Sequence, residues 1–383
     1  MSAWDTKRLG DVVAIIGGGT PTRNNPAFYG GAIPWVTPKD MKSWEIRGAQ
    51  VSITQSGLDN SSTRLVPPNS VLIVVRSGVL KHTIPVGLNR LPVAINQDMK
   101  ALQCREGVDP EFLAHFIKAQ SPIILQWVRA TTADNFPIDR LKSLHIPLPP
   151  LPEQQRIAEV LDRTEALRAK RRATLAQLNS LTQSIFIDIF GDPATNPKGW
   201  TWRMLKDLGA VITGGTPPSA KPGMFDGPIP FITPGDLESD RPVKRSVTEA
   251  GANEIVTVRG GAALVCCIGA TIGKIGKAAV RSSFNQQVNA VEWGETVNDS
   301  YGFAVLHFFK PTIIAWGAST TLPILKKSAF ERIEIPVPPI DLQREFARRL
   351  LILDRLEALS KASLASLDEL FAALQSRAFR GEL

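Results

Sequence analysis

The pattern of apolar and polar positions divides the chain into two kinds of segment. Residues 1–150 and 191–338 hold short apolar runs, such as 71–75, between turns that contain Gly and Pro. Short β-branched runs bounded by turn residues predict strands. Residues 153–190 and 341–380 are nearly free of Gly and Pro and are rich in Ala, Leu, Glu, Gln and Arg. Each of these two segments predicts one long helix.

Both predicted helices space their inward positions in alternating steps of three and four, as a coiled coil requires. We expect the two seams to pack on each other antiparallel, with the strand-rich domains at opposite ends; the alternative is that each helix packs only on its own domain. Helices of this length span roughly 55 to 60 Å and would act as a spacer. The seams run through Ile157, Val160, Thr164, Leu167, Arg171, Thr174, Leu178, Leu181 and Ile185, and through Phe346, Arg349 or Leu350, Leu353, Leu356, Ser360, Ser363 or Leu364, Leu367, Leu370 and Leu374.

The sequence contains one unit written twice. Segment 4–41 aligns without a gap with segment 200–237, and 16 of the 38 positions are identical, where chance at average composition gives about two. Two long copies predict two similar halves related by a pseudo-two-fold axis, rather than a solenoid of many short repeats. The shared motifs are Gly-Gly-Thr-Pro at 18–21 and 214–217, and Thr-Pro-x-Asp at 37–40 and 233–236.

Composition and charge only restrict the classes of partner, metal site and location that are possible. The 383 residues include 44 Lys and Arg against 36 Asp and Glu, a net charge of +8 that suits a polyanionic partner or plain solubility. Cys104, Cys266 and Cys267 are too few for a disulfide framework, and four histidines show no zinc-ligand spacing, so we predict no metal site. Without a long apolar stretch or a signal peptide, we expect a cytoplasmic protein.

The motifs, taken in order, resemble the specificity subunits of type I restriction-modification systems over the whole chain. Besides the two repeated motifs, the carriers are Val75-Arg-Ser-Gly78, the Pro-rich run at 146–155 that ends in Glu-Gln-Gln, and the terminal Ala378-Phe-Arg-Gly-Glu-Leu383. One departure is that the second Pro-rich turn, 338–343, lacks Glu-Gln-Gln and is followed by three extra residues before Asp-Arg-x-Glu-Ala-Leu. This departure bears on the equivalence of the two methyltransferase contacts, not on the architecture.

The resemblance implies an α+β fold in which two pseudo-two-fold-related, β-rich target-recognition domains, 1–150 and 191–338, are separated by two antiparallel coiled-coil helices, 151–190 and 339–383. Each domain would read one half of a bipartite asymmetric site in double-stranded DNA. The helices would set the spacing and dock two methyltransferase subunits, through which restriction/translocase subunits join. The rival interpretation is a non-catalytic two-domain scaffold protein without DNA sequence specificity, whose weak DNA binding would be insensitive to salt.

The chain itself is expected to be non-catalytic. It has no Asn/Asp-Pro-Pro-Phe/Tyr methyltransferase motif and no convincing nucleotide site. We therefore expect S-adenosylmethionine, ATP and magnesium on the partner subunits and no cofactor on this chain.

Candidate DNA-binding residues are basic and amide side chains in predicted loops, because such groups contact base edges and phosphates. For each of them the alternative is a solvated surface residue. We expect the difference in specificity between the halves in the variable stretches 42–70 and 238–260. Residues 1–150 carry 16 basic and 11 acidic side chains against 15 and 13 in 191–338, so the first domain should contribute more non-specific affinity. The candidates are Arg23, Asn24, Asn25, Lys39, Arg76, Lys81 and His82, and then Lys221, Lys244, Arg245, Lys274 and Lys277.

Four further motifs have competing interpretations. Residues 17–20 are predicted to form a tight turn and not a phosphate cradle, because no Lys-Ser/Thr follows. Residues 269–274 have one residue too few for a P-loop and Ile275 at the magnesium-binding position, which favours a basic loop beyond a buried strand. Asn96-Gln97 recurs as Asn285-Gln286 and is predicted to serve shared structure. Residues 170–172 fit equally a basic stripe facing DNA or a register device between helices.

Overall fold

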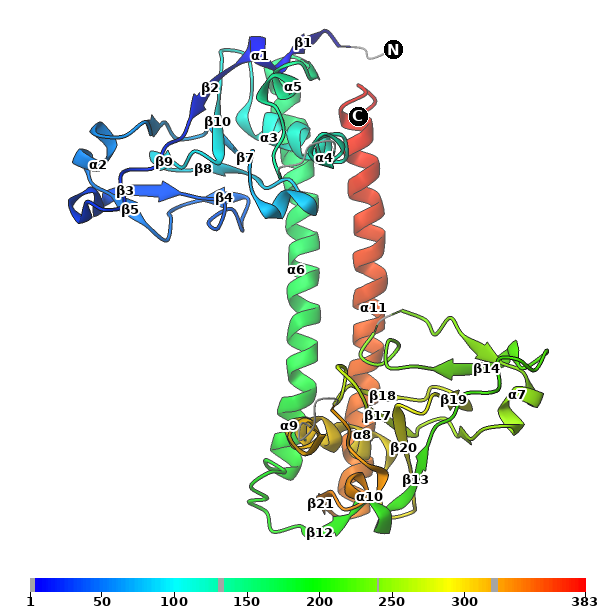
Figure 1. Cartoon of the computed structure of the whole chain (residues 1–383). Coiled ribbons are helices and arrows are strands. Elements are labelled where there is room, and N and C mark those ends of the chain that lie inside the picture. The colour runs from blue at the N-terminus through cyan, green and yellow to red at the C-terminus, as the bar shows by residue number, and fades with distance from the viewer. Residues whose placement is uncertain (1–3, 130–133, 240, 318–322) are drawn as a thin grey trace. The chain divides into compact units, whose positions relative to one another are not determined.

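The computed structural model divides into two compact units, of which the first comprises residues 1–172 and 362–383 and the second residues 173–361 (Figure 1). Each unit therefore contains one strand-rich domain and one end of each long helix. The predicted α+β fold is confirmed, and we describe each unit by itself. The described residues are 4–129, 134–239, 241–317 and 323–383, so position 240 of the variable stretch 238–260 lies outside them.

The two segments without Gly or Pro form the long helices α6 (Leu151–Phe190) and α11 (Ile340–Ala378), as predicted. In the first unit the beginning of α6 lies beside the end of α11, and Arg168 Nε contacts Asp368 Oδ1 at 2.6 Å. In the second unit the end of α6 meets the beginning of α11, where Phe190 lies 5.4 Å from Phe346 between ring centroids. The helices thus run antiparallel within each unit, and the alternative that each helix packs only on its own domain is wrong.

The predicted heptad seam is only partly correct. Ile157 and Phe346 are fully buried, whereas Leu167 and Leu370 are 54% and 48% exposed. The reason is that each helix end must also cover a domain core, so the buried positions follow the domain surface and depart from a strict seam. Leu161, outside the predicted seam, is completely buried in the core of the first unit.

A charged contact between the helices lies beside residues 170–172. Arg168 and Arg172 both reach Asp368 of α11, Arg172 at 3.4 Å, and Arg168 also stacks on the Phe371 ring at 4.5 Å. These contacts come from Arg168 and Arg172. The register-device interpretation rests on Arg171, the inward heptad position, and stays a prediction.

The first unit builds three sheets. The larger sheet has the order β2-β10-β7-β8-β4, with β2 (Val13–Gly17), β10 (Met99–Cys104), β7 (Val71–Val74), β8 (Val86–Asn89) and β4 (Glu45–Ile46). Its strands are antiparallel except that β4 runs parallel to β8. The second sheet has the order β5-β3-β9-β6, with β5 (Ser52–Ile53), β3 (Tyr29–Val36), β9 (Val93–Ile95) and β6 (Leu65–Val66). The third is the pair β1 (Thr6–Arg8) and β11 (His145–Pro147).

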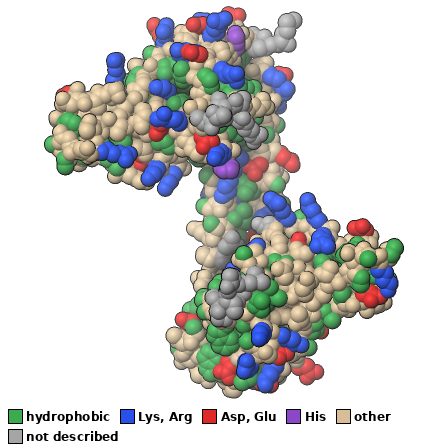
Figure 2. All heavy atoms as spheres, viewed as in Figure 1, with side chains coloured by type: hydrophobic (Ala, Val, Ile, Leu, Met, Phe, Trp, Pro, Cys, Tyr) green, Lys and Arg blue, Asp and Glu red, His purple; other side chains and the backbone are tan. Residues whose placement is uncertain are grey.

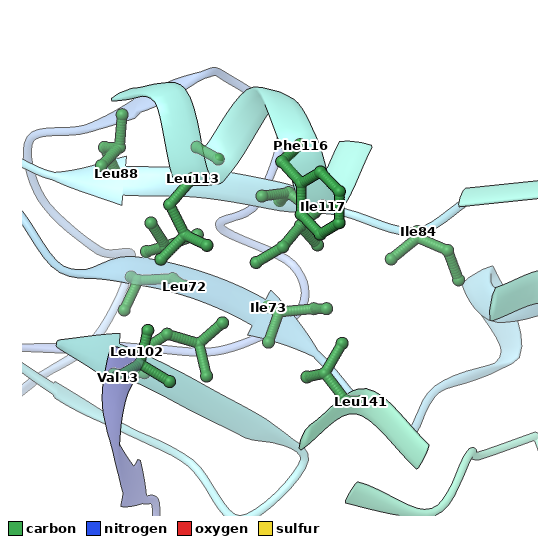
Figure 3. Close-up of a cluster of buried hydrophobic side chains, with 14 of the residues drawn as sticks. Val13, Leu72, Ile73, Ile84, Leu88, Leu102, Leu113, Phe116, Ile117 and Leu141 are labelled. Atoms are coloured by element: carbon green, nitrogen blue, oxygen red, sulfur yellow. The ribbon is translucent and has the colours of Figure 1, made fainter. Parts of the chain in front are cut away.

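Short helices complete the first unit, and one of them covers the larger sheet. Helix α3 starts where Asp109 Oδ1 accepts a hydrogen bond from the Phe112 amide at 2.9 Å, with Pro110 at the first helical position. Leu113 of α3 faces Leu72 of β7 in the core (Figure 3). Helix α3 covers one face of the sheet, and because the apolar run of β7 is buried at every residue, its other face is covered as well. The helices are α1 (Leu9–Val12), α2 (Gln55–Asp59), α3 (Pro110–Ala119), α4 (Ser121–Arg129) and α5 (Ile138–Lys142), with 3₁₀ turns η1 (Pro26–Phe28) and η2 (Gly78–Lys81).

The second unit repeats this plan with one strand fewer in its larger sheet. That sheet has the order β13-β20-β17-β18, with β13 (Gly209–Thr213), β20 (Val288–Trp293), β17 (Ala263–Cys266) and β18 (Ile275–Lys277). The second sheet has the order β15-β14-β19-β16, with β15 (Ser246–Val247), β14 (Phe225–Ile232), β19 (Ser282–Phe284) and β16 (Thr257–Val258). The remaining elements are the pair β12 (Thr201–Met204) and β21 (Glu334–Val337), the 3₁₀ turn η3 (Leu205–Asp207), and helices α7 (Glu249–Asn253), α8 (Asp299–Phe308), α9 (Lys310–Gly317) and α10 (Lys327–Phe330).

A buried glutamine anchors each long helix to its domain. Gln154 of α6 accepts a hydrogen bond from the Asp109 amide and donates to the carbonyls of Gly107 and Pro149, each at 2.9 Å. Gln343 of α11 makes the same three kinds of bond in the second unit, to Asn298, Thr296 and Pro338. The second Pro-rich turn therefore keeps this anchor although it lacks Glu-Gln-Gln.

Replacing Gln154 with Ala should destabilise the first unit by roughly 2 to 4 kcal/mol, because one buried amide and two carbonyls lose their partner. The neighbouring Gln155 is exposed, so Gln155→Ala is the matched control and should leave stability nearly unchanged. Urea unfolding of the purified chain measures the difference. Equal midpoints for the two variants would contradict the anchoring role.

Candidate nucleic-acid interface

In the first unit, two parallel strands bring turns formed by the repeated motifs to the same edge of a sheet. Strand β3 pairs with β9 through Val36 and Ile95, so the turns that follow both strands are neighbours. In the first turn, Asp40 Oδ2 accepts hydrogen bonds from the amide and the hydroxyl of Thr37, both at 2.8 Å. In the second turn, the Asn96 side chain accepts from the Asp98 amide at 3.2 Å. The side chains of the Thr-Pro-x-Asp and Asn-Gln motifs thus hold backbone turns.

The Gly-Gly-Thr-Pro loop packs directly on this edge. The Gly19 amide donates to the Ile95 carbonyl at 2.9 Å, and a Cβ atom on Gly18 would lie 1.8 Å from the Asn96 carbonyl oxygen. No side chain fits there, which explains the glycine. The Thr20 hydroxyl donates to Gln97 Oε1. Gly17 ends β2 and residues 18–20 form an irregular loop, so the tight-turn prediction for 17–20 is wrong. The shared structural role predicted for Asn96 and Gln97 is confirmed.

The second unit builds the same edge from its own copy of the motifs. The Thr216 hydroxyl donates to Gln286 Oε1 at 2.7 Å, and Asp236 Oδ2 accepts from the Thr233 amide at 2.8 Å. A Cβ atom on Gly214 would lie 2.2 Å from the Asn285 carbonyl oxygen. The backbone of this edge is therefore built in the same way in both units.

The two edges carry different side chains at positions that do not stabilise the turns. We call the two sets of corresponding residues the strand-end surfaces. In the first unit three of these residues are cations, and in the second unit a glycine, an isoleucine and a buried asparagine take their places. The first strand-end surface consists of Thr20, Lys39, Arg76, Gln97 and Lys100, and the second of Thr216, Gly235, Ile268, Gln286 and Asn289.

The cations of the first strand-end surface are accessible. Arg76 is 56% exposed and pairs with Asp98 at 2.6 Å between Nε and Oδ1. Lys39 is exposed, and Lys100 lines a shallow depression together with Arg76 and Gln97. Because an exposed ion pair contributes little stability, Arg76 can exchange its carboxylate partner for a phosphate or a base at small cost.

The other predicted residues of the first unit lie around this surface or support it. Arg23 and Asn24 are exposed in the loop after Thr20, whereas Asn25 caps η1 by accepting from the Ala27 amide at 3.2 Å. Lys81 ends η2 and lies 3.4 Å from Asp134, and the adjacent His82 is exposed. Asn25 thus has a structural role, while the other four present their side chains to solvent.

The predicted residues of the second unit are not brought together. Lys221 pairs with Glu254, and Arg245 stacks on the Phe231 ring at 5.0 Å, next to the exposed Lys244. The ammonium group of Lys274 lies 3.4 Å from the Pro234 carbonyl, beside the second strand-end surface. Lys277 ends β18 and points toward helix α8, where its ammonium group lies 5.6 Å from the Phe303 ring. Figure 2 accordingly shows cations interspersed with acidic side chains rather than an unbroken basic patch.

The glycine-rich stretch 269–274 is a hairpin loop. The Cys266 amide donates to the Lys274 carbonyl at 2.8 Å, and strand β18 follows where a P-loop would start a helix. The prediction of a basic loop beyond a buried strand is therefore confirmed.

Metal-ligating groups and thiols are the other chemically reactive side chains to place among the described residues. They contain no cluster of three or more His, Cys, Asp or Glu side chains placed to hold a metal ion. Burial raises the pKa of the Cys267 thiol to about 12, so this sulfur beside the second strand-end surface stays protonated and is a poor nucleophile at neutral pH. None of the helices in the described part of the chain combines the length and apolar character needed to cross a bilayer.

Sequence reasoning named Gln97 only as a structural residue, and it missed Lys100 and the two threonines of the strand-end surfaces. A signal for the threonines and glutamines was present, because both recur in the two copies of the repeat. For Lys100 there was none, since it lies within the strand β10, where a single basic residue looks like an ordinary solvent-facing position.

Comparison with known proteins agrees with this architecture. The model of the type I restriction modification DNA specificity domain matches residues 1–179 and 197–369. The chain is 26% identical over 378 residues to the type I restriction enzyme MjaIX specificity subunit of Methanocaldococcus jannaschii, covering 90% of this chain and 85% of that one. It is 39% identical over 164 residues to the EcoR124I/EcoR124II specificity subunit of Escherichia coli, a match spanning 42% of this chain and 41% of that subunit.

A solved structure shows the same fold across the whole chain. The S subunit of a type I restriction-modification system from M. genitalium has a TM-score of 0.64 at 16% identity and covers 99% of this chain and 96% of that one. The repeated strand-rich domains with long helices thus define a two-domain specificity protein. The chain belongs to the family of type I restriction-modification specificity subunits.

Substituting Gly18 with Ala should destabilise the first unit by about 1 to 3 kcal/mol, because the added methyl group collides with the Asn96 carbonyl. Gly48→Ala is the matched control, since a Cβ atom there meets nothing within 4 Å. Thermal unfolding of both variants measures the effect. If Gly18→Ala and Gly48→Ala unfold at the same temperature, the packing of this loop on the strand edge does not limit stability.

Proposed function

We propose that this chain is the DNA-recognition subunit of a type I restriction-modification complex and that each unit reads one half of a bipartite asymmetric site. One observation carries the proposal: the two strand-end surfaces share one backbone construction, but the first has three cations at positions where the second has Gly235, Ile268 and the buried Asn289. A protein that recognises two different DNA half-sites needs this combination. A constant backbone fixes the approach to DNA, and different side chains select different bases.

The charges of the first strand-end surface suit this role. Lys39, Arg76 and Lys100 can bind phosphates or donate to guanine. The second unit has no cation at the three corresponding positions, and its Asn289 is buried, with Oδ1 accepting from the Thr213 hydroxyl at 2.7 Å. The first unit would therefore supply more of the salt-dependent affinity.

We infer that the chain carries no catalytic centre and that methylation and cleavage belong to its partners. The long helices would dock two methyltransferase subunits, through which restriction/translocase subunits join. S-adenosylmethionine, ATP and magnesium would bind those partners. Family membership supports DNA and such subunits as partners in general.

The decisive experiment maps methylated bases in the genome of a host that expresses this chain with its methyltransferase. We expect a two-part methylated motif with a fixed gap that is absent when the methyltransferase is expressed alone. If the two proteins co-purify and no motif appears, a scaffold protein without sequence specificity is the better interpretation.

Arg76→Ile and Lys39→Ala should each weaken DNA binding by the methyltransferase complex and reduce the slope of log affinity against log salt by about one, because each removes one cation at the DNA. The exposed Lys7 on β1 offers the control, Lys7→Ala. Titrations at several salt concentrations measure the slope. An unchanged slope in both test variants would place the DNA elsewhere.

The helices are expected to act as a ruler. Inserting four residues into one of them lengthens it by about 6 Å, close to two base pairs at about 3.4 Å per step. Modification mapping with the insertion variant should show a longer gap between unchanged half-sites. An unchanged gap would defeat this idea.

A further inference from the structure

The larger sheet of the first unit is closed at one edge by β4, which Trp44 directly precedes in the chain. The Leu88 amide of β8 donates to the Trp44 carbonyl at 2.8 Å, and the Arg90 amide donates to the Ile46 carbonyl at 3.0 Å. The Trp44 indole packs on the His115 ring of α3 at 4.6 Å between centroids. Segment 44–46 thus contributes both backbone pairing and an aromatic side chain.

The second unit lacks this strand among its described residues. Strand β17 pairs with β18 as β7 pairs with β8, which places Lys277 at the position of Leu88. Beyond β18 no further strand joins the sheet in the described part of the chain. The connection that carries Trp44 in the first unit is shorter in the second unit. There Leu237 directly follows the Thr-Pro-x-Asp turn, and the Arg245 carbonyl accepts a hydrogen bond from the Phe231 amide.

A pocket lies where the second unit lacks the tryptophan. Its volume is about 420 Å³, and α8, β18, α6 and α11 all contribute to its walls. Ala304 stands at the position of His115 on the matching helix, so the space above the helix is open. Polar groups stand among the aromatic and aliphatic walls, an environment that suits an indole ring. The walls include Phe186, Lys277, Phe303, Ala304, His307 and Leu350.

The neighbouring sheet edge is available for pairing. The Lys277 amide corresponds to the Leu88 amide that donates to Trp44, and among the described residues it has no backbone acceptor. At the other end of the strand, Glu238 Oε1 accepts from the Ile275 amide at 3.2 Å and pairs with Lys310 at 2.5 Å. The open part of the edge therefore begins beside the pocket.

We propose that this edge and pocket bind an extended peptide segment of a protein partner. Its main chain pairs with β18 in the parallel sense of β4, and its tryptophan fills the pocket as Trp44 covers α3 in the first unit. Strand addition of this kind gives affinity through the main chain and specificity through the side-chain pocket. The inference rests on the comparison of the two units and is independent of DNA recognition.

The test uses the full-length chain and a labelled peptide with the sequence of residues 41–48, Met-Lys-Ser-Trp-Glu-Ile-Arg-Gly. Lys277→Pro removes the amide that faces the open edge, and proline is tolerated at such edge positions. Lys277→Ala is the matched control because it keeps the amide. By fluorescence anisotropy, Lys277→Pro should weaken peptide binding about tenfold or more, and Lys277→Ala should stay within about threefold of the unmodified chain.

A second measurement locates the tryptophan. A peptide with Ala in place of Trp should also bind about tenfold more weakly, and a photoreactive benzoylphenylalanine at that position should cross-link to Asp299–Phe308. These two results keep the test valid if Lys277→Pro does not fold. No binding, binding insensitive to the Trp substitution, or cross-links outside α8 would overturn the proposal. Free indole binding as tightly as the peptide would leave only a small-molecule pocket and would also overturn it.

Discussion

The core of each strand-rich domain is closed by the ends of two helices that are distant in sequence. In the first unit, Ile157 of α6 and Ala378 of α11 are fully buried in one cluster with the sheet. In the second, Phe186 of α6 and Phe346 of α11 are buried around Tyr301 of α8. Each large side chain buried in this way contributes about 1.5 to 3 kcal/mol. Neither domain is complete without both helices, so the helices are parts of the domain cores as well as connections.

This constraint explains why the strand-end surfaces can differ while the units remain alike. The stability of the first unit comes from its core and from the anchor Gln154, away from Lys39 and Arg76. The turns that carry the surface are fixed by Asn96 and Thr37 in the first unit and by their counterparts in the second. A substitution at Arg76 therefore changes the surface without loss of a core contact, which is the property that a reader of varied DNA sequences requires.

The two units nevertheless differ along their helices. Gln154 and Gln343 occupy the same place, yet the Asp-Arg-x-Glu-Ala-Leu motif lies three residues later in α11 than in α6. Three residues advance a helix by about 4.5 Å and do not complete a turn. Asp162 consequently pairs with the buried His115 at 2.7 Å, whereas Asp354 lines the pocket of the second unit. The two ends of the helices thus offer unequal surfaces to any partner.

The sequence by itself determined the elements that depend on local chemistry. The absence of Gly and Pro defined both long helices, and the repeated Gly-Gly-Thr-Pro indicated a loop in which only glycine fits at position 18. The same repetition identified Asn96 and Gln97 as structural.

Only the tertiary structure decided which apolar or polar face meets which neighbour. Periodicity predicted that Leu167 is buried between the helices, but Leu167 is exposed and Leu161 is the residue that packs into the domain core. The contact of Arg168 with Asp368 joins positions 200 residues apart, and the pocket beside Ala304 exists because a strand present in one unit is missing from the other. A sequence shows that a face can be buried; the partner that buries it comes from distant parts of the chain, which local patterns do not encode.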